Sequence, residues 1–162
     1  MKNKKGFTLI ELLAVIAIIA LISLIAIPNI IGLSTGIRKD QMLDDAKKLI
    51  SMAKYKVSKS YEIRNLTKSG DGCTVGVSCV FKFSDLNTGG DIKGDPDGGE
   101  YKGNTSTVTY SLSGGVAKYC VYLEGSKRKI CKKADSCTGD SCACNLCVNE
   151  DNLYSRNNVH DN

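Results

Sequence analysis

Residues 4–11 read KKGFTLIE and begin an apolar run that ends before Pro28. The run from Phe7 to Ile27 contains 21 residues, and Glu11 is its only charged residue. A helix of that length measures about 31 Å, which is enough to cross a bilayer hydrocarbon core of about 30 Å. The sequence therefore predicts a membrane-spanning helix over residues 7–28.

The basic residues near this run predict its orientation. Lys2, Lys4 and Lys5 precede the run, and basic residues collect on the cytoplasmic side of membrane helices. We therefore expect a single-pass protein of the cytoplasmic membrane, with residues 1–6 inside the cell and the bulk of the chain outside.

Glu11 is unusual because an acidic group inside an apolar span costs about 2.5–3.5 kcal/mol on insertion scales. No other residue of the run is charged, so a cationic partner must come from elsewhere. A cut after Gly6 would create an α-amino group on Phe7, one helical turn before Glu11. A carboxylate in a first turn is also favoured by the helix dipole. Cleavage would thus supply the missing positive charge.

The segment KKGFTLIELLAVIAIIALI, residues 4–22, resembles the start of a type IV prepilin. This family includes type IV pilins and the pseudopilins of secretion and DNA-uptake machines. The resemblance covers about 25 of the 162 residues. An ordinary signal peptide has an apolar core of only about 7–15 residues. A plain membrane anchor would give no reason for Glu11.

The resemblance implies a role for each residue of the motif. Residues 1–6 would form a leader peptide, in which a prepilin peptidase reads Lys4, Lys5 and Gly6. Cleavage would fall between Gly6 and Phe7, and Phe7 would be N-methylated. Glu11 would neutralise the amino terminus of a neighbouring subunit during assembly.

Pro28 falls where members of the family have a proline at which the helix loosens in the filament. Past this residue, apolar residues recur at spacings of three and four, which predicts an amphipathic half of the helix over residues 29–66. We expect one helix from about Phe7 to Ile63, with flexing at Pro28, Gly32 or Gly36. The predicted buried stripe consists of Leu43, Ala46, Ile50, Ala53, Val57 and Tyr61.

Residues 67–104 are rich in Gly, Asp, Ser and Asn and are predicted to be a connecting loop region, with only residues 80–83 strand-like. Two turn signals, Gly114-Gly115 and Gly125-Ser126, then predict an antiparallel meander over residues 105–133. Its expected strands are residues 105–113, 116–124 and 127–132.

Folding the chain at these two turns predicts the strand register. The pairs placed opposite each other on one face are Leu112 with Ala117, Tyr110 with Tyr119, Val108 with Val121, and Ile130 with Val121. This face would cover the helix stripe, so we expect an α+β, pilin-like fold.

All eight cysteines lie at position 73 or later, which suggests an oxidising compartment. The same turns place Cys120 opposite Cys131, within disulfide range, and we expect that bridge. Cys73 with Cys79 is the next expected pair.

The remaining cysteines lie in the C-terminal region, residues 134–162, and are Cys137, Cys142, Cys144 and Cys147. Four thiols could bind zinc, but only one of their intervals has the Cys-x-x-Cys spacing of zinc ribbons. We favour two disulfides in an irregular tail and expect no metal. The resemblance implies a C-terminal disulfide that closes a loop on the filament surface.

Two charged clusters allow more than one interpretation. The loop with Asp91, Asp95, Asp97 and Glu100 could hold calcium, but Asp with Gly and Pro is ordinary turn chemistry, which we favour. The basic residues of the last predicted strand could bind nucleic acid, but charges on an edge strand more often prevent unwanted strand pairing. These residues are Lys127, Arg128, Lys129, Lys132 and Lys133.

The sequence shows no catalytic constellation. His160 is the only histidine and has no companion base or nucleophile nearby in the sequence, and no phosphate-binding loop follows a strand. We therefore expect no enzyme and no cofactor. Without residues 1–6 the side chains carry 19 basic and 17 acidic groups, or +2, so global charge indicates no polyanionic partner.

Two functional hypotheses follow from the sequence. The first is a structural subunit of a type IV pilus or pseudopilus, stored in the membrane and then polymerised with copies of itself or other pilins on an assembly platform. The second is a membrane-anchored, cysteine-rich module that binds metal or nucleic acid and does not polymerise.

Overall fold

The computed structural model describes residues 7–133 and 144–162, without the side chains of residues 24–32, 133, 144 and 145. The chain divides into two compact units, residues 1–37 and 38–162.

Helix α1, Leu9–Lys59, begins in the first unit and continues into the second. It is one unbroken helical segment, and position 28 lies within it. Among the residues that the structure describes, no helix combines the length and the apolar character needed to cross a membrane. The predicted leader, residues 1–6, lies outside the described residues, as do the side chains of residues 24–28 of the predicted span.

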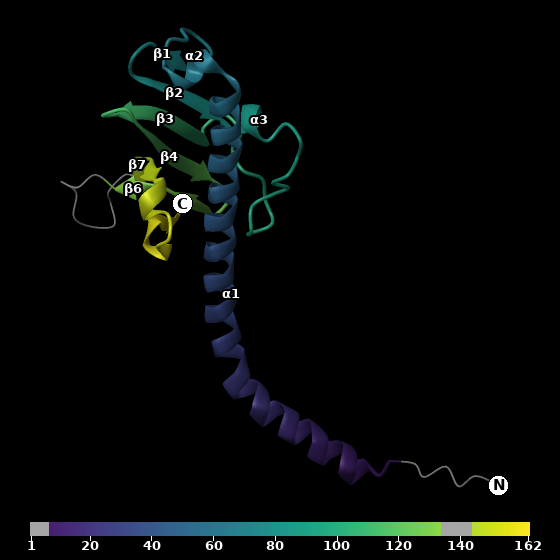
Figure 1. The fold of residues 1–162 in the computed structure, drawn as a ribbon. Coiled ribbons are helices and arrows are strands. Elements are labelled where there is room, and N and C mark those ends of the chain that lie inside the picture. Colours follow the sequence, from purple (N-terminus) through teal and green to yellow (C-terminus); the bar gives the residue numbers. More distant parts are fainter. Residues whose placement is uncertain (1–6, 134–143) are drawn as a thin grey trace. The chain divides into compact units, whose positions relative to one another are not determined.

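In the second unit, α1 packs across one face of a sheet (Figure 1). The predicted stripe is confirmed at its first five positions, Leu43, Ala46, Ile50, Ala53 and Val57, which are at most 4% exposed. Met42 and Leu49, which the sequence analysis left out, are buried as well. Together these side chains form the helical side of the core.

The prediction that the buried stripe includes Tyr61 is wrong, because Tyr61 is 71% exposed. Helix α1 ends at Lys59, and Ser60 adopts an extended conformation. The Ser60 hydroxyl caps a new short helix, α2 (Tyr61–Arg64), by accepting a hydrogen bond from the Ile63 backbone N–H. Because α2 is a separate helix, the spacing of buried residues along α1 does not continue into it, and Ile63 is buried in place of Tyr61.

Within the described residues, seven strands form one antiparallel sheet in the order β1-β2-β3-β4-β5-β9, and β8 also pairs with β4. Their bounds are β1 Cys73–Thr74, β2 Ser78–Lys82, β3 Thr107–Ser113, β4 Val116–Glu124, β5 Arg128–Ile130, β8 Val148–Asn149 and β9 Val159–Asp161. A helix packed on an antiparallel sheet confirms the predicted α+β class.

The shorter elements complete the described chain. They are α3 (Phe83–Leu86), the 3₁₀ turns η1 (Glu150–Asn152) and η2 (Arg156–Asn158), and the small sheet of β6 (Lys132–Lys133) with β7 (Cys144–Leu146).

The hairpin of β3 and β4 has the predicted register. Leu112 faces Ala117, Tyr110 faces Tyr119, and Val108 faces Val121. The turn consists of Gly114 and Gly115, with φ values of 61° and 79°. Both values lie in the left-handed region that a two-residue type I′ turn requires and that glycine adopts without strain.

The predicted register of β4 and β5 is wrong by two residues, because Ile130 faces Leu123 and not Val121. The connection is longer than the two-residue turn that the sequence suggested. The Gly125 N–H donates to the Arg128 carbonyl at 2.8 Å, which closes a wider loop. A shift of two leaves the same side chains on the core face, so Ile130 is still fully buried.

The predicted Cys120–Cys131 disulfide is also wrong. Cys120 is bonded to Cys147, with a Cα–Cα distance of 5.4 Å, and Cys131 belongs to another disulfide. The cause is strand β8, which places Asn149 opposite Cys120 and so brings Cys147 within reach. The other expected bridge is present, since Cys73 and Cys79 are bonded and face each other across β1 and β2.

Two regions contain more regular structure than the sequence predicted. The connecting region, residues 67–104, contributes β1, β2 and α3, and β2 pairs with β3 over five residues. The C-terminal region contributes β8 and β9 to the main sheet. Of the cysteines predicted to form disulfides in this region, Cys137 and Cys142 lie outside the described residues.

The disulfide pairing predicts the relative stability of two double variants. Cys120→Ser/Cys147→Ser should lower the free energy of unfolding by about 3 kcal/mol, because this bridge closes a long loop. Cys73→Ser/Cys79→Ser should lower it less, because that bridge joins residues only six apart, against 27 for Cys120–Cys147. Urea unfolding of the full chain in detergent measures both. A non-reduced proteolytic fragment joining Cys120 to Cys131 would contradict the assignment.

Candidate functional site

The first turns of α1 expose apolar side chains on all sides. Phe7 and Leu9 are each 81% exposed, and Val15, the most covered of the set, is still 45% exposed. The others are Ile10, Leu12, Leu13, Ile16, Ile18, Ile19, Leu21 and Ile22. A continuous apolar surface of this size marks a site of contact with lipid or with another protein.

Thr8 and Glu11 close the start of this helix as a capping box. The Thr8 backbone N–H and hydroxyl both donate to Oε2 of Glu11 at 2.8 Å. In return, the Glu11 N–H points to the Thr8 hydroxyl oxygen at 3.3 Å. The reciprocal bonds satisfy two donors of the first turn that have no partner within the helix. Thr8 therefore fixes the Glu11 carboxylate at the helix start.

The capping role of Thr8 was not predicted, although the sequence contains the T-x-x-E signal before an apolar run. The structure brings Phe7, Thr8 and Glu11 together in one turn of chain. The predicted leader residues Lys4, Lys5 and Gly6 lie outside the described residues, and so does the side chain of Pro28.

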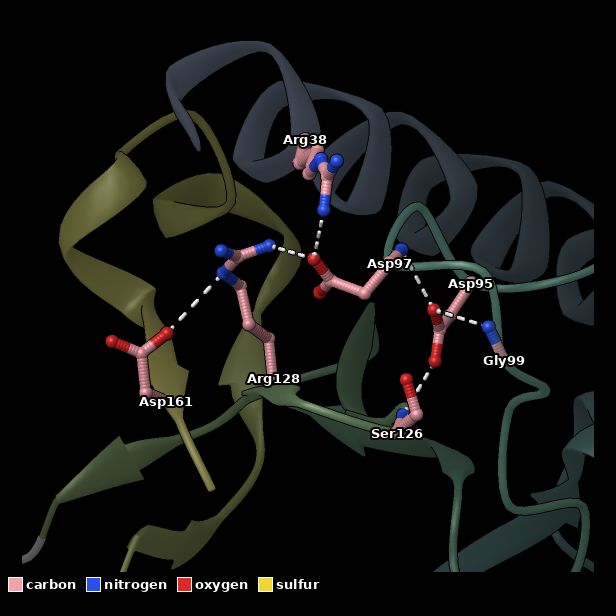
Figure 2. A network of polar contacts seen from close by, with 7 residues as sticks. All are labelled: Arg38, Asp95, Asp97, Gly99, Ser126, Arg128 and Asp161. Atoms are coloured by element: carbon pink, nitrogen blue, oxygen red, sulfur yellow. Dashed lines mark hydrogen bonds and ion pairs between the residues drawn. The ribbon is translucent and has the colours of Figure 1, made fainter. Parts of the chain in front are cut away.

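The aspartate-rich loop of the second unit forms a turn held by Asp95 (Figure 2). Oδ1 of Asp95 accepts hydrogen bonds from the backbone N–H groups of Asp97 at 2.7 Å and Gly99 at 3.1 Å. Its Oδ2 accepts from the backbone N–H of Ser126, in the loop between β4 and β5. Burial by itself would raise the pKa of Asp95, but these hydrogen bonds outweigh it, so the pKa lies below the usual range.

Asp97 extends this network to α1 and β5. Its side chain is only 3% exposed and pairs with Arg38 of α1 at 3.2 Å and with Arg128 of β5 (Figure 2). Arg128 also approaches Asp161 of β9, with Nε and Oδ1 3.2 Å apart. The loop thus connects the helix, the β4–β5 turn and the last strand.

These contacts support the turn interpretation of the loop over the calcium interpretation. The oxygens of Asp95 and the Oδ1 of Asp97 are engaged by backbone N–H groups and guanidinium groups, while Asp91 and Glu100 are exposed. Among the described residues, no three or more His, Cys, Asp or Glu side chains are grouped so that they could hold a metal ion.

The edge-strand interpretation is wrong for Arg128 and Lys129, whereas Lys132 and Lys133 lie in β6, a strand of the two-stranded sheet. Strand β5 lies between β4 and β9, so it is an interior strand. Arg128 is 12% exposed and paired with Asp97 and Asp161, which leaves it little freedom to contact a phosphate. The neighbouring Lys129 lies opposite His160 of β9.

Comparison with known families gives information on the start of α1 and none on the aspartate-rich loop. The family model described as "Prokaryotic N-terminal methylation motif" matches residues 1–27. The motif places the chain among the type IV pilin-like and pseudopilin-like proteins. No curated protein and no solved structure matches the chain.

Type IV pilin-like proteins are generally structural subunits without enzymatic activity. The motif implies a membrane-anchored precursor, processing by a prepilin peptidase and assembly with other pilins. The α+β fold, with its long helix, antiparallel sheet and disulfides, is pilin-like as well. The exposed apolar start of α1 is therefore the candidate functional site, and the Asp95–Asp97 loop is a structural element of this pilin-like protein.

The hydrogen bonds to Asp95 predict how its contribution to stability depends on pH. A depressed pKa in the folded state gives stability that is present above the unfolded pKa, about 3.9, and is lost as pH falls through the folded pKa. Asp95→Asn should therefore be less stable than the wild type by about 1–3 kcal/mol at pH 7. This difference should shrink as the pH is lowered below about 4.

Urea unfolding of the full pilin-like chain in detergent, at several pH values, measures this difference. Asp91→Asn is the matched control, because Asp91 is exposed, and it should change stability little at any pH. A difference between the wild type and Asp95→Asn that stays constant down to pH 2 would contradict the role given to these hydrogen bonds.

Proposed function

We propose that the chain is a structural subunit of a type IV pilus or pseudopilus filament. The observation that carries the proposal is the methylation motif over residues 1–27, with one carboxylate, Glu11, in an otherwise uncharged helix start. The exposed apolar surface around that helix supports it, because such a surface needs lipid before assembly and protein after it.

In this proposal a prepilin peptidase, guided by Lys4 and Lys5, cuts between Gly6 and Phe7. Phe7 becomes the amino terminus and is N-methylated. The precursor is a single-pass protein of the cytoplasmic membrane, and the assembled subunit is part of a filament at the cell surface. Its partners are copies of itself or other pilins, the peptidase and a membrane assembly platform.

Glu11 guides assembly in this proposal by receiving the amino terminus of a neighbouring subunit. Opposite charges attract more strongly in an apolar environment than in water, so a pair formed between helices would compensate the cost of burying the carboxylate. The bonds from Thr8 keep the carboxylate at the first turn, and the oxygen atom Oε1 receives no hydrogen bond from the described residues. Thr8 and a neighbour's amine can therefore bind the same carboxylate together.

Transfer from lipid to filament changes the apolar burial little. The side chains around α1 would exchange contact with lipid for contact with other subunits, and both environments exclude water. Helix association in such a setting depends on packing and on the charge pair. Extraction from the membrane requires an external motor, which the assembly platform would supply.

Replacing Glu11 tests the proposal. Glu11→Ala should still insert and be cleaved, but the amount of sheared filament should fall at least about tenfold, because the neighbour's amine loses its partner. Immunoblots of membranes and of sheared filaments from the native host separate insertion, cleavage and assembly. Glu100→Ala, which removes an exposed carboxylate from the second unit, is the control and should assemble normally. Wild-type amounts of filament in Glu11→Ala would refute the role of Glu11.

A further inference from the structure

Residues of α1, α2 and α3 line a groove in the second unit. Figure 1 shows α3 beside the C-terminal part of α1. The volume of the groove is about 1060 Å³. One wall comes from α1 and the start of α2, and the other comes from α3 and the residues that follow it, up to Asp91. This volume lies just above the usual range of about 300–1,000 Å³ for ligand sites and suits an extended ligand.

The floor of the groove is apolar. Ile63 and Leu86 line it and are 5% and 9% exposed, and Met52 lines it from α1, partly buried against the core. The Tyr55 ring stands beside them and is 62% exposed. A ligand with apolar side chains could therefore remove further apolar surface from water here.

Lysines dominate the charge of the groove. Five line it, namely Lys47, Lys48, Lys56, Lys59 and Lys68, against the two carboxylates of Asp85 and Asp91. The difference of five and two gives a net charge of +3. The groove therefore attracts a ligand with net negative charge.

Two of these lysines make no ion pair with any residue that the structure describes. Lys56 lies over the Phe81 ring at 5.5 Å, and Lys59 lies over the Tyr55 ring at 4.7 Å. In contrast, Lys47 and Lys48 pair with Asp44 and Asp45 of their own helix, and Lys68 pairs with Asp71. The ammonium groups of Lys56 and Lys59 are thus available to an incoming carboxylate.

A second hollow continues the same surface toward β2. It shares Lys56, Ile63, Lys68 and Asp85 with the first and adds one lysine, Lys82, and one carboxylate, Asp71. The two hollows together are therefore longer than a single small molecule would need.

We propose that this groove binds an acidic polypeptide segment that carries apolar side chains. Such a segment can place its apolar side chains on Met52 and Leu86 and its carboxylates at Lys56 and Lys59. This is the way an amphipathic helix binds in a groove. The site lies within the second unit, and the proposal does not rest on filament assembly.

The groove fits a polypeptide better than a nucleic acid. An extended phosphate backbone would pass Asp85 and Asp91, which would repel it, and would gain nothing from the apolar floor. A polypeptide can keep its carboxylates away from Asp85 and Asp91. Its net negative charge would still match the lysines of α1.

Fluorescence anisotropy with the full-length chain in detergent micelles tests the proposal. The probe is a short fluorescein-labelled peptide of Glu and Leu in amphipathic helical spacing. The comparison probes are the same peptide with Lys in place of Glu, and an oligothymidylate of equal length. The acidic peptide should bind most tightly, and its affinity should fall as salt is raised.

The variant Lys56→Gln/Lys59→Gln should weaken binding of the acidic peptide about tenfold, because two charge contacts are lost. Lys118→Gln/Lys127→Gln makes the same change of charge at exposed positions outside the groove and should leave binding unchanged. Equal weakening by both double variants, or no binding of the acidic peptide, would overturn the proposal. Equal or tighter binding of the oligothymidylate would overturn it in favour of a nucleic-acid site.

Discussion

The apolar side chains of α1 have to leave water, and this constraint organises both units of the chain. In the second unit they occupy one face of the helix, and the sheet covers them; each fully buried Leu or Ile there contributes about 1.5–3 kcal/mol. In the first unit they surround the helix, and nothing among the described residues covers them. Contact with lipid or with another protein would remove them from water, which makes the start of α1 the candidate functional site, while the second unit has its own core.

A second constraint, the pairing of buried carboxylates, fixes details of the head. Asp95 holds the β4–β5 loop through Ser126, and Asp97 holds α1 and β5 through two arginines. Removing one partner from such a buried group leaves the other unsatisfied, which costs more than the bond itself contributed. The loop, for which the sequence favoured a turn over a calcium site, therefore acts as a connector between elements.

Local patterns explain how much of this could be predicted from sequence. The stripe from Leu43 to Val57 and the hairpin at Gly114-Gly115 depend on neighbours in the chain, and both were predicted correctly. Strands β8 and β9 have two and three residues, too few to show a pattern, and they pair with distant partners. The error in the partner of Cys120 follows from β8. At the candidate site, Glu11 was recognised from its charge, whereas the capping role of Thr8 became evident from the hydrogen bonds.

The account depends on Glu11 meeting a positive terminus that exists only after cleavage. Intact-mass and N-terminal fragment spectra of the chain, isolated from its native host, test this most directly. The account predicts a polypeptide that begins at Phe7 and carries an additional methyl group on its amino nitrogen. A mature chain that still begins at Met1 would contradict it, because Glu11 would then have no neighbouring terminal amine to pair with.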